Sequence, residues 1–158
     1  MLELIPPRQG DRPVTTSANP HEQRSQNPSP EIYSVLKARA FNFQCIDRVP
    51  SRISVPGAEA LWMHDACCHG PAEAFMVGNE FAHIHPEYDG SLHLALPGKV
   101  ANELIQKGWG EPHPVAKLGL IPSTIIMVYA PRNHEEVDWV LKIIKASYEF
   151  AHGTDGKL

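Results

Sequence analysis

The sequence has no cluster of basic residues and no long hydrophobic run. Its 14 Lys and Arg residues are outnumbered by 18 Asp and Glu residues, which gives a formal net charge of −4. Because nucleic acids and anionic membranes are recognised through clustered positive charge, neither is an expected partner. No window approaches the roughly 18 apolar residues of a membrane-spanning helix, and the N-terminus lacks the pattern of a secretory signal. We therefore predict a cytoplasmic protein.

Cysteine is also scarce, with only Cys45, Cys67 and Cys68 in the chain. An odd number that includes an adjacent pair is not the pattern of a disulfide framework. A zinc site built from cysteines is not expected either, because the paired Cys-x-x-Cys motifs of such sites are missing. We predict reduced and mostly buried thiols.

The length and composition are those of one globular domain, with 158 residues of which 42% are hydrophobic. Residues 1–28 are rich in Pro, Ser, Gln and Asn, which predicts a disordered or extended N-terminal arm. Residues 29–153 are predicted to form a single α+β domain, followed by a flexible C-terminus over residues 154–158.

Helix signals are clearest at the starts of two segments. Ser29 and Asn133 are expected N-caps, and Glu136 follows Asn133 at the spacing of a capping box. Three helices are predicted, over residues 30–43, 99–107 and 134–152.

Strand signals are clearest in the second half of the chain. The apolar run at residues 123–130 predicts a central strand, and residues 80–96 predict a β-hairpin. Residues 58–68 fit either a short helix or an irregular strand, whereas residues 71–77 look extended. We predict an antiparallel β-sheet of about four or five strands with helices packed on one face.

The hairpin has a register that can be argued from its residues. Apolar and polar residues alternate on both sides of a strong turn sequence at residues 86–90. For the aliphatic residues of both strands to face the core, Ile84 must lie opposite Leu92. A slip by one residue would turn one set outward.

This register brings three imidazoles onto one patch of the other sheet face. His83 lies opposite His93, and His85 lies opposite Ser91. Directly opposed residues have Cβ atoms about 5 Å apart. Glu80 is predicted to point to the opposite face, away from the histidines.

Converging imidazoles support two kinds of chemistry. Without a metal they act as acids, bases or hydrogen-bond donors near neutral pH, with Asp89 or Glu111 orienting a ring. With zinc or another divalent metal, His83, His85 and His93 are the ligands and leave a position open for water. A solvated polar sheet face remains a third interpretation.

Residues 109–114 form a second candidate element. Trp109 offers a flat wall for an organic ligand, and His113 is held between two prolines, where it adds a donor. A rigid connection without a ligand is equally consistent with this loop. Arg132 is suited to a substrate carboxylate or to a solvated helix start. No role is assigned to three histidines in the termini or exposed turns, His21, His134 and His152.

A family resemblance is carried by four blocks in a fixed order: Glu80-x-x-His83-x-His85-Pro86, Asp89-Gly90-Ser91-x-His93, Gly108-Trp109-Gly110 with His113, and Val128-Tyr129-Ala130-Pro131-Arg132. Together they resemble the "luciferase domain-containing" proteins, which are common in fungi and have shorter relatives in bacteria. The resemblance covers roughly residues 75–151. It implies a shared feature made of His85, Asp89, Ser91, His93, Trp109 and His113.

We predict a small-molecule enzyme of the natural-product type that catalyses a cofactor-independent cyclisation, isomerisation or lyase step, pericyclic steps included. Phosphate-binding loops and dinucleotide fingerprints are missing, which argues against nucleotide, NAD and flavin cofactors. The alternatives are a zinc-type metal-dependent hydrolase or lyase and a non-catalytic binding or interaction module, and a homodimer is one open assembly. The predicted catalytic residues are His83, His85, His93 and His113. The predicted substrate-binding residues are Ser91, Asp89, Trp109, Glu111, Tyr129 and Arg132.

Overall fold

The computed structural model describes residues 4–154, in which six strands form one antiparallel sheet in the order β1-β2-β3-β4-β6-β5. They are β1 (Ile46–Pro50), β2 (Glu59–Met63), β3 (Glu80–Ile84), β4 (Leu92–Ala95), β5 (Gly110–Pro112) and β6 (Ile125–Val128). The predicted α+β class with an antiparallel sheet is confirmed. The unpredicted strands β1 and β5 are the two edges, where Pro50 and Pro112 are tolerated because an edge residue need not donate to a neighbour.

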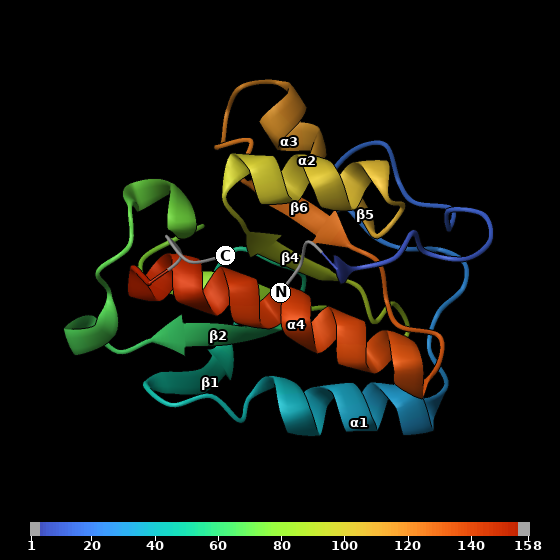
Figure 1. The fold of residues 1–158 in the computed structure, drawn as a ribbon, viewed down its shortest axis with the longest axis horizontal. Helices are drawn as coiled ribbons and strands as arrows, with labels where there is room; N and C mark the ends of the chain where they lie inside the picture. The colour runs from blue at the N-terminus through green and yellow to red at the C-terminus, as the bar shows by residue number, and fades with distance from the viewer. Residues whose placement is uncertain (1–3, 155–158) are drawn as a thin grey trace.

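Four α-helices accompany the sheet in the described part of the chain: α1 (Pro30–Ala40), α2 (Gly98–Gln106), α3 (Pro114–Lys117) and α4 (His134–His152). In Figure 1, α4 lies across the sheet, with α1 beside it. Both predicted caps are confirmed, because Ser29 accepts a hydrogen bond from Ile32 N and Asn133 accepts one from Glu136 N. The Glu136 carboxylate does not complete a capping box and binds Arg132. None of the helices within residues 4–154 is long and apolar enough to cross a membrane.

The segment between β1 and β3 differs from its prediction in two ways. Residues 71–77, expected to be extended, contain a short 3-10 helix at Ala72–Ala74, which places Ala74 in the core beside α4. Cys45 and Cys67 form a disulfide with a Cα–Cα distance of 6.4 Å, so the prediction of three reduced thiols is wrong. The two cysteines come together because β1 and β2 pair antiparallel: Cys45 directly precedes Ile46, which pairs with Met63, and Cys67 follows Met63 at the same end of the pair. Cys68 is free.

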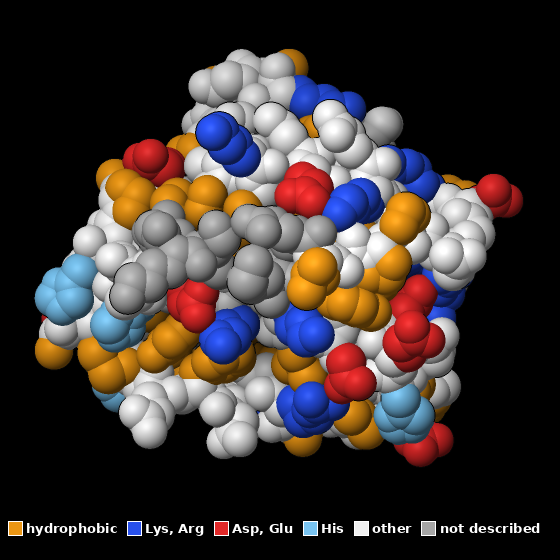
Figure 2. Space-filling model, in the orientation of Figure 1, with side chains coloured by type: hydrophobic (Ala, Val, Ile, Leu, Met, Phe, Trp, Pro, Cys, Tyr) orange, Lys and Arg blue, Asp and Glu red, His pale blue; other side chains and the backbone are white. Residues whose placement is uncertain are grey.

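The hydrophobic core lies between the sheet and the helices α1 and α4. Leu92 and Leu94 of β4 are fully buried, as are Leu36 of α1 and Val140 of α4. On the face seen in Figure 2, acidic and basic side chains are interspersed without a continuous area of either sign. The core fixes one face of the β3–β4 hairpin, so the histidines must occupy the other.

The N-terminal arm, residues 4–28, takes an extended course along the domain and is the blue trace beside β5 in Figure 1. Ile5 is buried in the core, and the indole of Trp109 donates to Pro6 O at 2.7 Å. Arg12 donates to Gly110 O on β5 at 2.7 Å. These contacts carry the arm to the histidine face of the sheet.

Candidate active site: a buried histidine cluster

The hairpin has the predicted register. Ile84 pairs with Leu92, and His83 pairs with His93. Beyond the paired residues, His85 N donates to Ser91 O at 2.9 Å. The three imidazoles are almost completely buried, with His93 only 4% exposed. Burial excludes the interpretation of this face as a solvated polar surface.

A cavity of about 440 Å³ lies over the cluster. All four histidines predicted to be catalytic line it, and so does His21 of the arm. The lining residues that complete the cavity are Asn19, Pro20, Ile53, Ser54, Val55, Met76, Val115, Ile121 and Ile125. The cavity therefore combines a floor of imidazoles with largely apolar walls.

His21 is the site residue that the sequence analysis missed. Its Nδ1 lies 2.9 Å from Nε2 of His93, and its Nε2 lies 3.0 Å from a carboxylate oxygen of Glu111. It is buried, whereas the sequence suggested a free terminal segment. No local pattern around His21 signals this position, because its partners lie 72 and 90 residues away in the chain.

Glu80 also differs from its prediction, because it lies on the histidine face. Its carboxylate is 2.8 Å from Nδ1 of His83. The register between β2 and β3 shifts at this point: Leu61 pairs with Ala82 but Trp62 pairs with Glu80. The extra residue, Phe81, forms a β-bulge that reverses the alternation of side chains and turns Glu80 over.

The cluster contains a continuous chain of polar contacts from Glu80 to Glu111. After the contact with Glu80, Nε2 of His83 lies 3.1 Å from Nδ1 of His93, which leads on to His21. Burial strongly disfavours charge on these rings. Desolvation lowers the pKa of His83 and brings the pKa of His93 well below its usual range, so both rings favour the neutral form.

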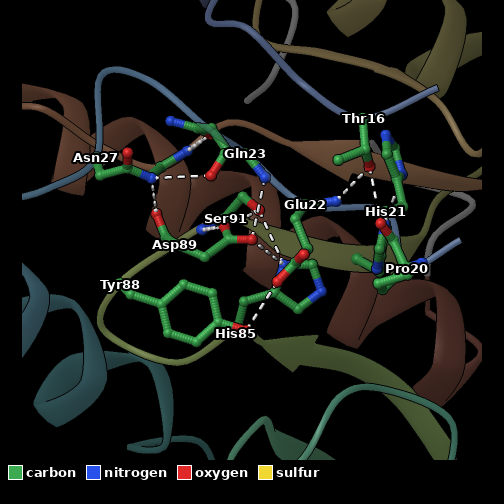
Figure 3. A network of polar contacts seen from close by, with 12 residues as sticks. Thr16, Pro20, His21, Glu22, Gln23, Asn27, His85, Tyr88, Asp89 and Ser91 are labelled. Carbon is green, nitrogen blue, oxygen red and sulfur yellow. Dashed lines mark hydrogen bonds and ion pairs between the residues drawn. The ribbon is translucent and has the colours of Figure 1, made fainter. Parts of the chain in front are cut away.

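His85 is held by a separate network (Figure 3). Its Nδ1 lies 2.9 Å from Oγ of Ser91 and 3.3 Å from the carboxylate of Asp89, and the Ser91 hydroxyl donates to that carboxylate. Gln23 N of the arm donates to the same carboxylate at 3.0 Å. Burial would raise the pKa of Asp89, but hydrogen bonds from His85 and Ser91 outweigh it and lower the pKa. Because an ionised Asp89 only accepts, it holds a proton on Nδ1 of His85, and in the neutral tautomer of this ring Nε2 carries the lone pair.

His113 has the opposite tautomer. Val115 N donates to its Nδ1 at 3.1 Å, which places the ring proton on Nε2. Desolvation, followed by the neighbouring His21, lowers the pKa of His113 to about 4, so the ring is neutral near pH 7. His113 is therefore a hydrogen-bond donor at the cavity, beside His93 at a centroid distance of 4.6 Å.

The residues predicted to bind substrate fall into two groups. Asp89, Ser91 and Glu111 lie behind the histidines and orient them, and Tyr129 donates to Glu111 at 3.0 Å. The second group, Trp109 and Arg132, makes its contacts away from the histidines. Trp109 is buried beneath the arm, and Arg132 is paired with Glu136. None of the six lines the cavity within the described residues.

Fold and site together define an α+β protein with a histidine cluster buried at the floor of a cavity. Residues 78–147 match a family model described as Luciferase domain. Proteins named Luciferase from Armillaria gallica and Neonothopanus nambi are 33% and 29% identical over 169 residues, covering 92% of this chain. The chain spans 60% of the length of these curated relatives. The resemblance to the luciferase domain-containing family is confirmed, and no solved structure matches the chain.

Proposed function

We propose that this protein is an enzyme that transforms a small, largely apolar organic molecule by acid/base chemistry in the histidine-lined cavity. The observation that supports this most strongly is the convergence of five histidines on one cavity of about 440 Å³. Cavities of this size with apolar walls and a few directed polar groups are typical of small-molecule sites. A cyclisation, isomerisation or lyase step fits best, because each needs a substrate held in a reactive shape and a proton moved.

Two imidazoles have complementary roles in this reaction. His113 presents an N–H at Nε2, which suits it to donate a hydrogen bond to a carbonyl or developing oxyanion of the substrate. His85 presents the lone pair of Nε2, and its Nδ1 proton is fixed by Ser91 and Asp89. In a metal-free site, His85 is the general base.

The apolar walls select the substrate class. Ile53 and Val55 come from the segment after β1, and Val115 and Ile121 come from α3 and the segment after it. Such walls exclude water from the imidazoles and favour a hydrophobic, flexible metabolite over a phosphorylated or strongly charged one.

A metal-dependent hydrolase or lyase reaction is the second candidate. It is favoured by the contacts of Glu80 with His83 and of Asp89 with His85, because metal-binding imidazoles usually donate their other N–H to a carboxylate. In that case a metal-bound water takes the place of His85 as base.

The experiment is a turnover screen on purified protein, with polyene and polyketide-like metabolites followed by mass spectrometry. Photon emission is recorded in the same samples, because curated relatives are named Luciferase. We expect His113→Ala to lower turnover by about 10²- to 10³-fold, the usual cost of removing one hydrogen-bond donor to a developing oxyanion. His134→Ala is the matched control, because that side chain is 65% exposed at the start of α4.

Full activity of the folded His113→Ala variant would contradict the assigned role. Ligands that stabilise the wild-type protein against heating but are never converted would favour a binding module in place of an enzyme.

A further inference from the structure

The chain of contacts from Glu80 to Glu111 contains more hydrogen-bonding contacts than neutral histidines can fill. Four contacts join five groups, and each contact needs one proton between its two atoms. A carboxylate only accepts, and an imidazole in its neutral tautomer has one N–H, so the three rings supply three protons in that form. One contact is therefore left with two lone pairs facing each other unless a cation fills it.

The tautomers restrict this gap to one of the two contacts that His93 makes. Because carboxylates only accept hydrogen bonds, Nδ1 of His83 carries its ring proton and donates to Glu80. In the same way, Nε2 of His21 donates to Glu111. His93 then has one N–H for two neighbours. If it donates to His21, its Nδ1 lone pair faces the Nε2 lone pair of His83 at 3.1 Å.

His85 offers a third ligand atom close to these two rings. The Nδ1 proton of His85 is directed to Ser91 and Asp89, so its Nε2 is bare. Ligand atoms of His83, His85 and His93 all lie within 4.8 Å of one another. Converging lone pairs of three neutral imidazoles are the donor set that binds a divalent transition metal.

We propose that Nε2 of His83, Nε2 of His85 and Nδ1 of His93 bind one divalent metal ion of the zinc class. Two ligands about 2.0–2.1 Å from a tetrahedral zinc ion are about 3.3 Å apart, close to the 3.1 Å between His83 and His93. All three ligands come from one hairpin, whose register the core fixes. The carboxylates of Glu80 and Asp89 orient two of the rings, and His21 with Glu111 behind it orients the third.

A neighbouring trio, His21, His93 and His113, has equally close nitrogen atoms. It is unsuited to a metal because Val115 N–H occupies Nδ1 of His113 and leaves a proton on the nitrogen that would have to bind. His113 therefore faces the metal site as a donor. The fourth coordination position is left to water or to an oxygen of the substrate in the cavity.

This inference rests on the proposed function only for the use of a metal-bound oxygen, because metal binding is measured without substrate. The first measurement is metal content by mass spectrometry of the full, untagged chain purified without chelator. We expect about one equivalent of metal per chain. After chelation, titration with cobalt(II) should give the visible absorption of a tetrahedral site at one equivalent.

The variants separate the two trios. His83→Ala and His85→Ala should lose the metal, whereas His113→Ala should keep it while losing turnover. Glu80→Gln keeps the ligands and should weaken zinc binding by about 10- to 100-fold. Circular dichroism checks that each variant is folded, and the cobalt titration of the wild-type protein decides the case if the alanine variants do not fold.

A folded wild-type protein that contains no metal and binds neither zinc nor cobalt would overturn the metal site, and an additional proton would then fill the gap. Loss of metal in His113→Ala together with retention in His85→Ala would overturn the assignment to this trio. Metal bound as expected, with turnover unaffected by His113→Ala, would instead contradict the proposed function alone.

Discussion

Single residues of the arm provide hydrogen-bond partners for buried polar groups of the domain. Gln23 is fully enclosed: its backbone N–H donates to Asp89, and its side-chain oxygen accepts from Ala130 N at 2.9 Å. Asn27 donates to Asp89 O at 2.8 Å, as Figure 3 shows. Because a buried N–H without a partner is costly, these hydrogen bonds hold the arm against the domain.

We expect Gln23→Ala to lower the free energy of unfolding by about 1–3 kcal/mol, since Ala130 N–H would be left without an acceptor. Urea denaturation followed by circular dichroism measures the change. Gln9→Ala is the control, because the Gln9 side chain is exposed on the same arm. Equal stability of the two variants would mean that water reaches Ala130 N when the glutamine is removed.

At the scale of elements, the pairing of two strands decides which carboxylates reach the histidines. The bulge in β3 turns Glu80 toward His83, and the edge strand β5 brings Glu111 to the histidine face. The register across the sheet explains the second case, because Glu111 pairs with Met127 and Met127 pairs with His93. Directly opposed residues share a sheet face, so the carboxylate lies on the side of the imidazoles.

Gly110 is required for β5 to approach β6, because a Cβ at this position would lie 2.2 Å from Met127 O. Gly110→Ala should therefore separate the two strands and lower the free energy of unfolding by about 1–3 kcal/mol. Gly98→Ala is the control in chemical denaturation, because a Cβ there meets no atom within 4 Å. An unchanged Gly110→Ala protein would show that β5 moves aside at little cost.

At the scale of the whole molecule, the site is formed by segments that are far apart in sequence. The arm, the hairpin and the α3 region each contribute histidines to one cavity. On the other side of β3, Glu59 of β2 binds Arg48 of β1 at 2.7 Å and also binds Lys37 of α1. This ion pair network fixes the edge of the sheet to the helix that follows the arm.

Acid should weaken this network. The hydrogen bond from Arg48 lowers the pKa of Glu59 to about 2, below its ordinary value of 4.5. Between these values the unfolded state binds more protons than the folded state, so the contribution is complete above about pH 4.5 and is lost toward pH 2. Because 32% of the side chain is exposed, we expect only about 1 kcal/mol.

Glu59→Gln should therefore be less stable than the wild-type protein at pH 7, and the difference should shrink as the pH falls to about 2. Thermal unfolding across this range measures it, with the exposed carboxylate variant Glu73→Gln as control. A difference that stays constant with pH would mean that Glu59 acts through packing and not through its charge.

The sequence by itself determined the features that depend on neighbours in the chain. Alternation of aliphatic residues fixed the hairpin register, and with it the convergence of His83, His85 and His93. Capping residues fixed the starts of α1 and α4, because a cap acts on backbone groups three residues away. These signals are local, so no knowledge of the rest of the fold is needed.

Only the tertiary structure decided the features that depend on contact between distant segments. His21 joins the cluster because the arm docks beside β5, and Glu80 joins it because a bulge forms against β2. Cys45 and Cys67 meet because β1 and β2 pair. Such contacts depend on the packing of the whole chain and leave no periodic pattern in the sequence around the residues that make them.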